Sequence, residues 1–314
     1  MFDIFCFSLT NIAVDESGLV SSTATGSWRI TLQKQGDNSR PARRPVTHMG
    51  KFVLNPERDL PLLQLVRDAT FISRQQIELL IADRTDESNY DNRNRRIARL
   101  VKRDQLQIYP QCFPYPGRIF AITYAGINTL QVAGMGILSV STDTETLAEV
   151  AQVPHFIGLN EIEIAARQAF NVIQWIGDRQ LKSLNIAASR PTQKDYDSIV
   201  EIAGLPDTTS PIYLGIEYER TIKSKERYAQ IRKKLDGERQ IHGLLYFVDN
   251  EANATLLSRE VYSATVPVGV VIASQFQLSG VNAALRVVQN RSVVRTSVND
   301  YVTSIKRLRH QSET

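Results

Sequence analysis

Two glutamates one residue apart, in the segment IYLGIEYERTIKSKERY (residues 212–228), are the first candidates for chemistry in this sequence. Because alternate residues of an extended strand share a face, Glu217 and Glu219 are predicted to point the same way. Asp197 opens the preceding extended segment, and a turn at residues 205–211 brings the two segments side by side. Carboxylates on adjacent strands favour a hard cation such as Mg²⁺ or Mn²⁺, which takes oxygen ligands.

A metal ion at this position would polarise a phosphodiester and generate a hydroxide. Basic residues just beyond the glutamates, among them Lys223, would hold the scissile phosphate. The candidate catalytic residues are therefore Asp197, Glu217, Glu219 and Lys223, and the candidate metal ligands are Asp197 and Glu217. The ordinary alternative is a polar strand face neutralised by neighbouring Arg220 and Lys223. Glu201 and Asp207 are further carboxylates of this region, so Asp197 is not a unique partner for Glu217.

A strongly basic predicted helix at residues 91–104 points to a second kind of function. It has six basic residues between Asn92 and Arg103 and no acidic residue among them, while Ile97 and Leu100 lie on an apolar face. A helix that enters the major groove needs one apolar face on its own domain and one cationic face toward the DNA. The alternative is a solvated basic face, but a predicted hairpin follows directly and favours DNA binding. The candidate DNA-contacting residues are Arg93, Arg95, Arg96, Arg99, Arg103 and Arg118.

Around this helix, the sequence predicts a winged helix-turn-helix domain over residues 56–133. Three helices, a hairpin with a Pro/Gly turn and a closing helix follow one another in the order of that motif. Pro56 favours the start of the first helix, and Ser73 is a good N-cap for the second. Residues 1–55 are predicted to be a poorly ordered arm, and residues 134–153 a linker.

Residues 154–260 predict a small mixed sheet with helices on both faces, in the order α-β-β-β-α-β. The expected helices span residues 160–176 and 225–235, and the expected strands span residues 184–188, 198–203, 212–221 and 243–248. The last strand is an apolar run typical of a strand buried inside a sheet. Residues 261–314 are predicted to be a strand and a basic C-terminal tail, either an additional DNA-contacting helix or a solvated terminus. The predicted fold class is α+β with a mixed sheet.

Three segments resemble motifs of the replication-relaxation family of plasmid and mobile-element proteins, which includes the MobC-type mobilisation proteins. They are FAITYAG (120–126), HFIGLNE (155–161), and YLGIEYERT (213–221) with the Lys-Ser and Arg-Tyr pairs that follow it. The resemblance covers roughly residues 56–250. It implies a winged helix joined to a restriction-endonuclease-like PD-(D/E)xK domain.

In that domain the resemblance gives Asp197 the role of the motif's first Asp and Glu217 that of its acidic residue. Two positions depart from the pattern. Tyr196 stands where the motif has Pro, and Glu219 stands where it has Lys. These departures weaken the case for catalysis, although Lys223 would supply a cation from the next turn.

The composition of the chain mainly excludes certain classes of protein and of metal site. The 314 residues include 37 Lys and Arg against 33 Asp and Glu, a net charge of +4, so the clustering of charge is more informative than its sum. Cys6 and Cys112 lie far apart, which argues against a disulfide scaffold or a structural zinc site and favours a reducing compartment. Four separated histidines form no local three-His metal site, and His155 is interpreted as structural. No apolar run approaches the ~18 residues of a transmembrane helix, so the sequence predicts a cytoplasmic protein without a membrane partner.

The leading prediction is a DNA-binding protein of a plasmid or mobile element that acts in replication control or mobilisation. Its predicted partners are double-stranded DNA, at an origin-like site, and other replication or transfer proteins. One alternative is a metal-dependent DNA-nicking, relaxase-type phosphodiesterase that uses Asp197 and Glu217 with Mg²⁺ or Mn²⁺. The other alternative is a non-catalytic recruitment platform.

Overall fold

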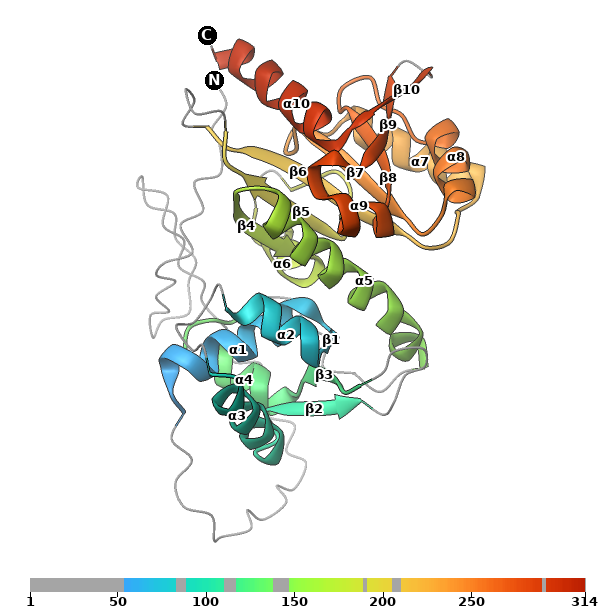
Figure 1. The fold of residues 1–314 in the computed structure, drawn as a ribbon. Coiled ribbons are helices and arrows are strands. Elements are labelled where there is room, and N and C mark those ends of the chain that lie inside the picture. Colours follow the sequence, from blue (N-terminus) through green and yellow to red (C-terminus); the bar gives the residue numbers. More distant parts are fainter. Residues whose placement is uncertain are drawn as a thin grey trace, which may run out of the picture.

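The computed structural model describes residues 54–82, 89–109, 117–137, 147–188, 191–204, 210–289 and 292–313. These residues form a mixed α+β structure with two separate sheets, as the sequence predicts. In Figure 1 the smaller sheet and its helices lie below the larger sheet. The arm expected at residues 1–55 lies outside the described residues, apart from Leu54 and Asn55.

The N-terminal unit has a three-stranded sheet in the order β1-β3-β2, in which β3 pairs antiparallel with both neighbours. Its helices are α1 (Pro56–Ala69), α2 (Arg74–Ile81), α3 (Tyr90–Lys102) and α4 (Tyr124–Val132). Its strands are β1 (Ile72–Ser73), β2 (Leu106–Tyr109) and β3 (Ile119–Ile122). All of these except the two-residue strand β1 agree with the sequence prediction to within about two residues.

Local sequence explains why these helices begin where they do. Pro56 occupies the first turn of α1, where its missing N–H costs nothing. The Ser73 hydroxyl accepts a hydrogen bond from the Gln76 backbone N–H (3.2 Å), and the Gln76 side chain accepts one from the Ser73 N–H (3.1 Å). This reciprocal capping box confirms Ser73 as the N-cap of α2.

The second unit is built on a seven-stranded sheet in the order β10-β9-β8-β7-β6-β5-β4. The strands β6, β7 and β8 are parallel, and the remaining pairs are antiparallel. The strands are β4 (Val172–Gly177), β5 (Ser198–Ile202), β6 (Ile212–Glu219), β7 (Gly243–Val248), β8 (Val268–Ile272), β9 (Ala284–Gln289) and β10 (Ser292–Ser297). Every residue of β7 is buried, as its apolar run predicts.

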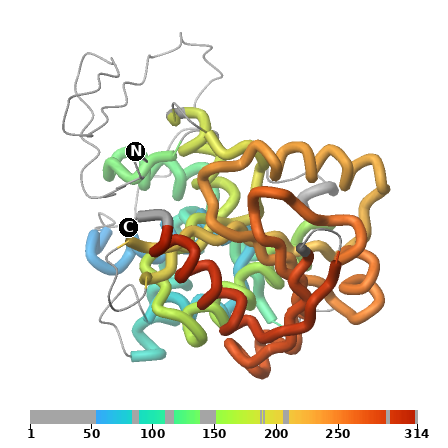
Figure 2. Tube along the Cα trace, turned by 90° about the horizontal axis from the view of Figure 1, so that it is seen from above, coloured from blue at the N-terminus to red at the C-terminus, as the bar shows by residue number. Residues whose placement is uncertain are grey.

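Helices cover both faces of this sheet. The helices are α5 (Leu147–Ala169), α6 (Asp178–Ala187), α7 (Lys225–Asp236), α8 (Glu251–Glu260), α9 (Ala273–Ser279) and α10 (Val298–Glu313), and a 3-10 turn spans Gly280–Asn282. Apolar residues of α5, α9 and α10 pack in one core, and those of α6, α7 and α8 pack in another. Figure 2 shows α7 and α10 on opposite sides of the sheet.

Two expected elements of this unit are wrong. Residues 172–176, expected as the end of a helix, belong to strand β4, and residues 184–187, expected as a strand, belong to helix α6. Ile173 and Ile176 continue the helical spacing of the apolar residues before them, so periodicity alone does not show where the helix ends. Residues 172–176 form a strand because they pair with β5, which lies farther along the chain, and local periodicity does not contain that pairing.

The segments on either side of the predicted second domain also differ from expectation. Helix α5 begins at Leu147, inside the range expected to be a linker. Residues 261–314 hold β8, β9, β10 and α10, so they continue the sheet rather than forming a strand with a tail. The apolar face of α10, including Tyr301 and Ile305, is buried in the core, and this burial makes the segment part of the sheet domain.

Helix α5 also connects the two units. The side chain of Gln76 donates a hydrogen bond to the Ile157 carbonyl, and that of Asn160 donates one to the Phe71 carbonyl, both at 2.8 Å. Ile157 packs beside Phe71 in a small buried cluster that includes residues of β2 and β3. The N-terminal unit is therefore attached to α5 near residues 155–160. The same segment of α5 contributes to the candidate functional site.

Candidate functional site

The predicted approach of Asp197 to Glu217 follows from the pairing of β5 with β6. In this antiparallel pair Ser198 lies opposite Ile216, so the next positions along the strands are Asp197 and Glu217. Glu201 lies opposite Tyr213, four residues farther from this point, and Asp207 is outside the described residues. The structure therefore brings Asp197, rather than Glu201, beside the glutamates of β6.

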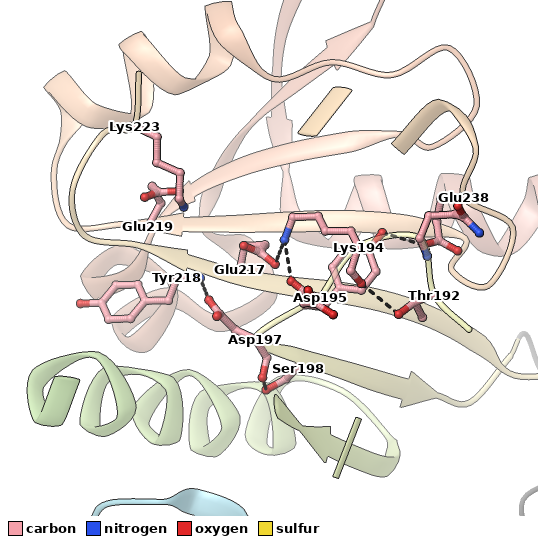
Figure 3. Close-up of polar contacts among 12 residues, drawn as sticks. Thr192, Lys194, Asp195, Asp197, Ser198, Glu217, Tyr218, Glu219, Lys223 and Glu238 are labelled. Atoms are coloured by element: carbon pink, nitrogen blue, oxygen red, sulfur yellow. Dashed lines mark hydrogen bonds and ion pairs between the residues drawn. The ribbon is translucent and has the colours of Figure 1, made fainter. Parts of the chain in front are cut away.

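Glu217 carries a partner that the sequence analysis missed. The Lys194 ammonium forms an ion pair with the Glu217 carboxylate, and each side chain is less than a tenth exposed. Lys194 also donates a hydrogen bond to the Asp195 carbonyl (3.0 Å) and lies over the Tyr196 ring, 4.9 Å from its centroid. Figure 3 shows the lysine side chain extending along the sheet to reach Glu217.

Asp197 is held by different donors. Its Oδ2 accepts a hydrogen bond from the Tyr218 backbone N–H (2.8 Å), and its Oδ1 lies 3.4 Å from Nε2 of His155 on α5. Burial by itself raises the pKa of Asp197, but the hydrogen bond and charge of His155, the Tyr218 N–H and the Lys194 charge together outweigh burial and hold that pKa below its ordinary value. Asp197 is therefore an ionised carboxylate whose nearest basic neighbour is His155.

The imidazole of His155 is fixed by packing as well as by Asp197. It stacks on the Tyr218 ring with a centroid separation of 5.7 Å and an interplanar angle of 16°. Helix α5 approaches this ring closely at Gly158, where an added Cβ would lie 2.2 Å from the Tyr218 Cε1. The glycine of the segment HFIGLNE is therefore required by the tyrosine of β6.

Glu219 and Tyr246 complete this part of the sheet. Glu219 is 5 % exposed and forms an ion pair with Lys223, so Lys223 neutralises a carboxylate instead of pointing free toward solvent. Tyr246 lies opposite Glu217 on β7, and its buried hydroxyl has no hydrogen-bond partner among the described residues. Burial, with the charges of Glu217 and Glu219, raises the pKa of Tyr246 well above its ordinary value, so the phenol stays protonated.

These contacts do not fit the Mg²⁺ or Mn²⁺ ion that the sequence suggested. Such an ion takes several oxygen ligands, and Mg²⁺ requires near-ideal octahedral geometry. The described part of the chain has no group of three or more His, Cys, Asp or Glu side chains arranged to hold a metal. Glu217, one of the two expected ligands, already contacts the Lys194 ammonium. The Lys194 ammonium therefore competes with a metal ion for the oxygens of this carboxylate.

Lys194 precedes Asp197 by three residues in QKDYDS, so it lies near the predicted acidic site along the chain. The backbone bends at residues 193 and 194, before β5 begins at Ser198, so strand alternation does not show that Lys194 reaches Glu217. The pairing of His155 with Asp197 likewise depends on how α5 packs against the sheet. No local pattern contains that information.

The basic residues of α3 divide into two groups. The guanidinium groups of Arg96 and Arg99 contact the Asp59 carboxylate of α1, with Nη1 of Arg96 at 2.6 Å and Nη2 of Arg99 at 2.8 Å. Arg93 contacts Glu78 of α2, its Nε lying 2.5 Å from the carboxylate. Three residues expected to face DNA thus bind carboxylates of the neighbouring helices, because both acidic residues lie within reach of α3.

The other group faces solvent. Arg95 and Lys102, seven residues apart and so on one side of α3, are exposed and have no ion-pair or hydrogen-bond partner in the described ranges. Arg118, directly before β3, is also exposed. Arg103 is half-buried at the C-terminal end of α3. Fewer basic residues of α3 are free to face a partner than the sequence suggests, and Arg95 and Lys102 are two of them.

Comparison with protein-family models, characterised proteins and solved structures finds no significant match to this chain. Its function therefore has to be inferred from its own geometry. Within the described ranges, no helix is both long and apolar enough to cross a membrane.

Proposed function

We propose that this protein binds double-stranded DNA through the exposed side of α3. The observation that supports the proposal is that the side chains of α3 have different roles on its different sides. Ile97 and Leu100 bury one side, Arg93 and Arg96 bind carboxylates of α1 and α2, and Arg95 and Lys102 remain exposed. A helix fixed by its neighbours and cationic on its outer side meets the requirements of major-groove recognition.

The surrounding elements support the same function. The order α1, β1, α2, α3, β2, β3 with a β1-β3-β2 sheet is that of a winged helix-turn-helix, in which α3 is the recognition helix and β2 and β3 form the wing. Arg118 lies at the loop end of this hairpin, directly before β3, and is exposed. On this proposal the wing adds phosphate contacts beside the groove contacts of α3.

The second unit supports a role other than cleavage. Its α5, β4, β5, β6, α7 and β7 follow the order of a PD-(D/E)xK nuclease core, with α6 inserted. The carboxylates in the motif positions, however, already contact Lys194, His155 and Lys223. We therefore propose a DNA-binding protein of replication control or mobilisation whose second unit binds DNA or a protein partner without cutting.

A double variant tests the assignment of α3. Arg95→Ala/Lys102→Ala should weaken binding to duplex DNA and lower the slope of log K against log salt by about 2, because each lost phosphate contact changes that slope by about 0.9. Fluorescence anisotropy on a labelled duplex at several salt concentrations measures both quantities. The matched control is Arg95→Lys/Lys102→Arg, which keeps both positive charges and should leave the slope unchanged. An unchanged slope in the α3 variant would contradict the proposal.

A further inference from the structure

Three carboxylates near the end of β6 each contact a basic side chain of the protein itself. Glu217 pairs with Lys194, Glu219 pairs with Lys223, and Asp197 lies against His155. We infer that the Lys194 ammonium occupies the position of a divalent cation and keeps this centre free of metal. This inference concerns the site alone and does not depend on the DNA binding proposed above.

Lys194 is held as a fixed part of the structure. The residue is 7 % exposed, and its ammonium contacts the Glu217 carboxylate and the Asp195 carbonyl. The ammonium also lies over the Tyr196 ring, with Nζ 4.9 Å from the ring centroid, and this cation–π contact helps to hold it in place. An ion from solvent that replaced this ammonium at Glu217 would leave the buried lysine charge without its partner, and that cost opposes the exchange.

Asp197 cannot hold a metal ion without Glu217. Its carboxylate accepts a hydrogen bond from the Tyr218 N–H and contacts His155, so it still has free lone pairs, but a single carboxylate does not make a metal site. Glu219 pairs with Lys223 on the same side of β6 as Glu217. Removal of the Lys194 charge is therefore the single change that frees a buried carboxylate next to Asp197. Two oxygen-bearing groups and solvent would then meet the minimum needs of a hard cation.

The test asks whether removing the lysine creates a metal site. Lys194→Met should gain binding of Mn²⁺, seen as loss of the free-ion electron paramagnetic resonance signal, by roughly 10- to 100-fold over the wild-type protein. The same variant should also melt at a higher temperature when Mn²⁺ is added, because an ion that binds only the folded state stabilises it. Wild-type protein should show neither effect.

Two controls separate this result from general effects of charge. Lys223→Met removes a partly exposed lysine from the other glutamate, and it should gain no comparable Mn²⁺ affinity. Lys194→Met/Glu217→Gln removes both members of the buried pair, and it should fold without metal and ignore Mn²⁺. If Lys194→Met does not fold, Lys194→Gln retains a hydrogen-bond donor near Glu217 and serves in its place.

Two outcomes would overturn the inference. One is wild-type protein that binds Mn²⁺ with an affinity lost in Glu217→Gln, since the ion would then coexist with Lys194. The other is failure of both Lys194 variants to respond to Mn²⁺, since the lysine would then not be the group that excludes the metal. Neither result would bear on the α3 variants, so failure here is distinguishable from failure of the proposed DNA binding.

Discussion

The Nη1 of Arg96 on α3 lies 2.6 Å from the Oδ1 of Asp59 on α1, and Asp59 has no solvent exposure. Asp59 also accepts a hydrogen bond from the Asn55 backbone N–H at 2.8 Å, and it contacts Arg99. One buried carboxylate thus organises the start of α1 and the orientation of α3. Part of the positive charge on α3 serves the fold of the domain, and only the remainder is available for a partner.

Replacing Asp59 should destabilise the N-terminal unit strongly. In Asp59→Asn, Arg96 and Arg99 lose the charge of their shared partner, and breaking a buried ion pair costs about 3–5 kcal/mol of unfolding free energy. Urea unfolding followed by circular dichroism measures this change. Asp91→Asn, at an exposed site in the first turn of α3, is the control and should cost less than about 1 kcal/mol. Equal stability of the two variants would contradict the role given to Asp59.

Two fully buried tyrosines should respond oppositely to loss of their hydroxyl groups. The Tyr301 hydroxyl accepts a hydrogen bond from the Leu244 N–H (3.1 Å) and shares its single proton between the Pro267 carbonyl (2.8 Å) and the Leu244 carbonyl (3.0 Å). The Tyr246 hydroxyl has no such partner among the described residues. Tyr301→Phe should lower the unfolding free energy by about 1–2 kcal/mol, and Tyr246→Phe should leave it unchanged or raise it by up to about 1 kcal/mol. Chemical denaturation of both variants tests this. A large loss in Tyr246→Phe would show that its hydroxyl has a partner.

The close approach of α5 to Tyr218 predicts that Gly158 tolerates no larger residue. In Gly158→Ala the new Cβ would lie 2.2 Å from the Tyr218 Cε1, so the ring must move away from His155. We expect a loss of about 1–3 kcal/mol in unfolding free energy, as for other overpacked cores. Gly237→Ala is the control, because its Cβ would meet no atom closer than 3.6 Å and the backbone φ is −87°. That variant should equal or slightly exceed the wild type in stability.

The contact of His155 with Asp197 should make stability depend on pH. Burial by itself lowers the pKa of His155, but the hydrogen bond and charge of Asp197, with the charge of Glu217, outweigh burial and the Arg220 charge and raise that pKa above 6.5. A raised folded-state pKa stabilises the protein fully below the unfolded value, and this stabilisation is lost as the pH rises through the folded value. The stability gap between wild type and His155→Gln should therefore be larger at about pH 5.5 than at about pH 8.5.

Urea unfolding of both proteins across this pH range provides the measurement. In an Asp197→Asn background, which removes the charge that raises the pKa of His155, the His155→Gln substitution should show a much smaller pH-dependent gap. A gap for His155→Gln that is constant with pH, or that grows toward alkaline pH, would contradict the ion pair with Asp197.

Much of the fold follows from local features of the sequence. The helices α1 to α4 begin at residues that cap or start helices, and β7 is an uninterrupted apolar run, so their positions could be predicted. Strand β4 could not, because its apolar residues fit helical and extended spacing equally well. The sheet strands β9 and β10 were missed for a related reason, since their pairing depends on β8 and on each other.

In the candidate sites too, some features follow from neighbouring residues, and others depend on residues far apart in the sequence. By itself, the sequence determined that Glu217 and Glu219 share one face of a strand, that Asp197 begins the neighbouring strand, and that α3 is basic. These conclusions rest on periodicity and pairing order, which neighbouring residues set. Only the tertiary structure decided which cation neutralises which carboxylate. Asp59 and Arg96 are 37 residues apart, and Lys194 and Glu217 are 23 residues apart. Packing brings each pair together, and burial makes each pair necessary, because a charge removed from water requires a partner.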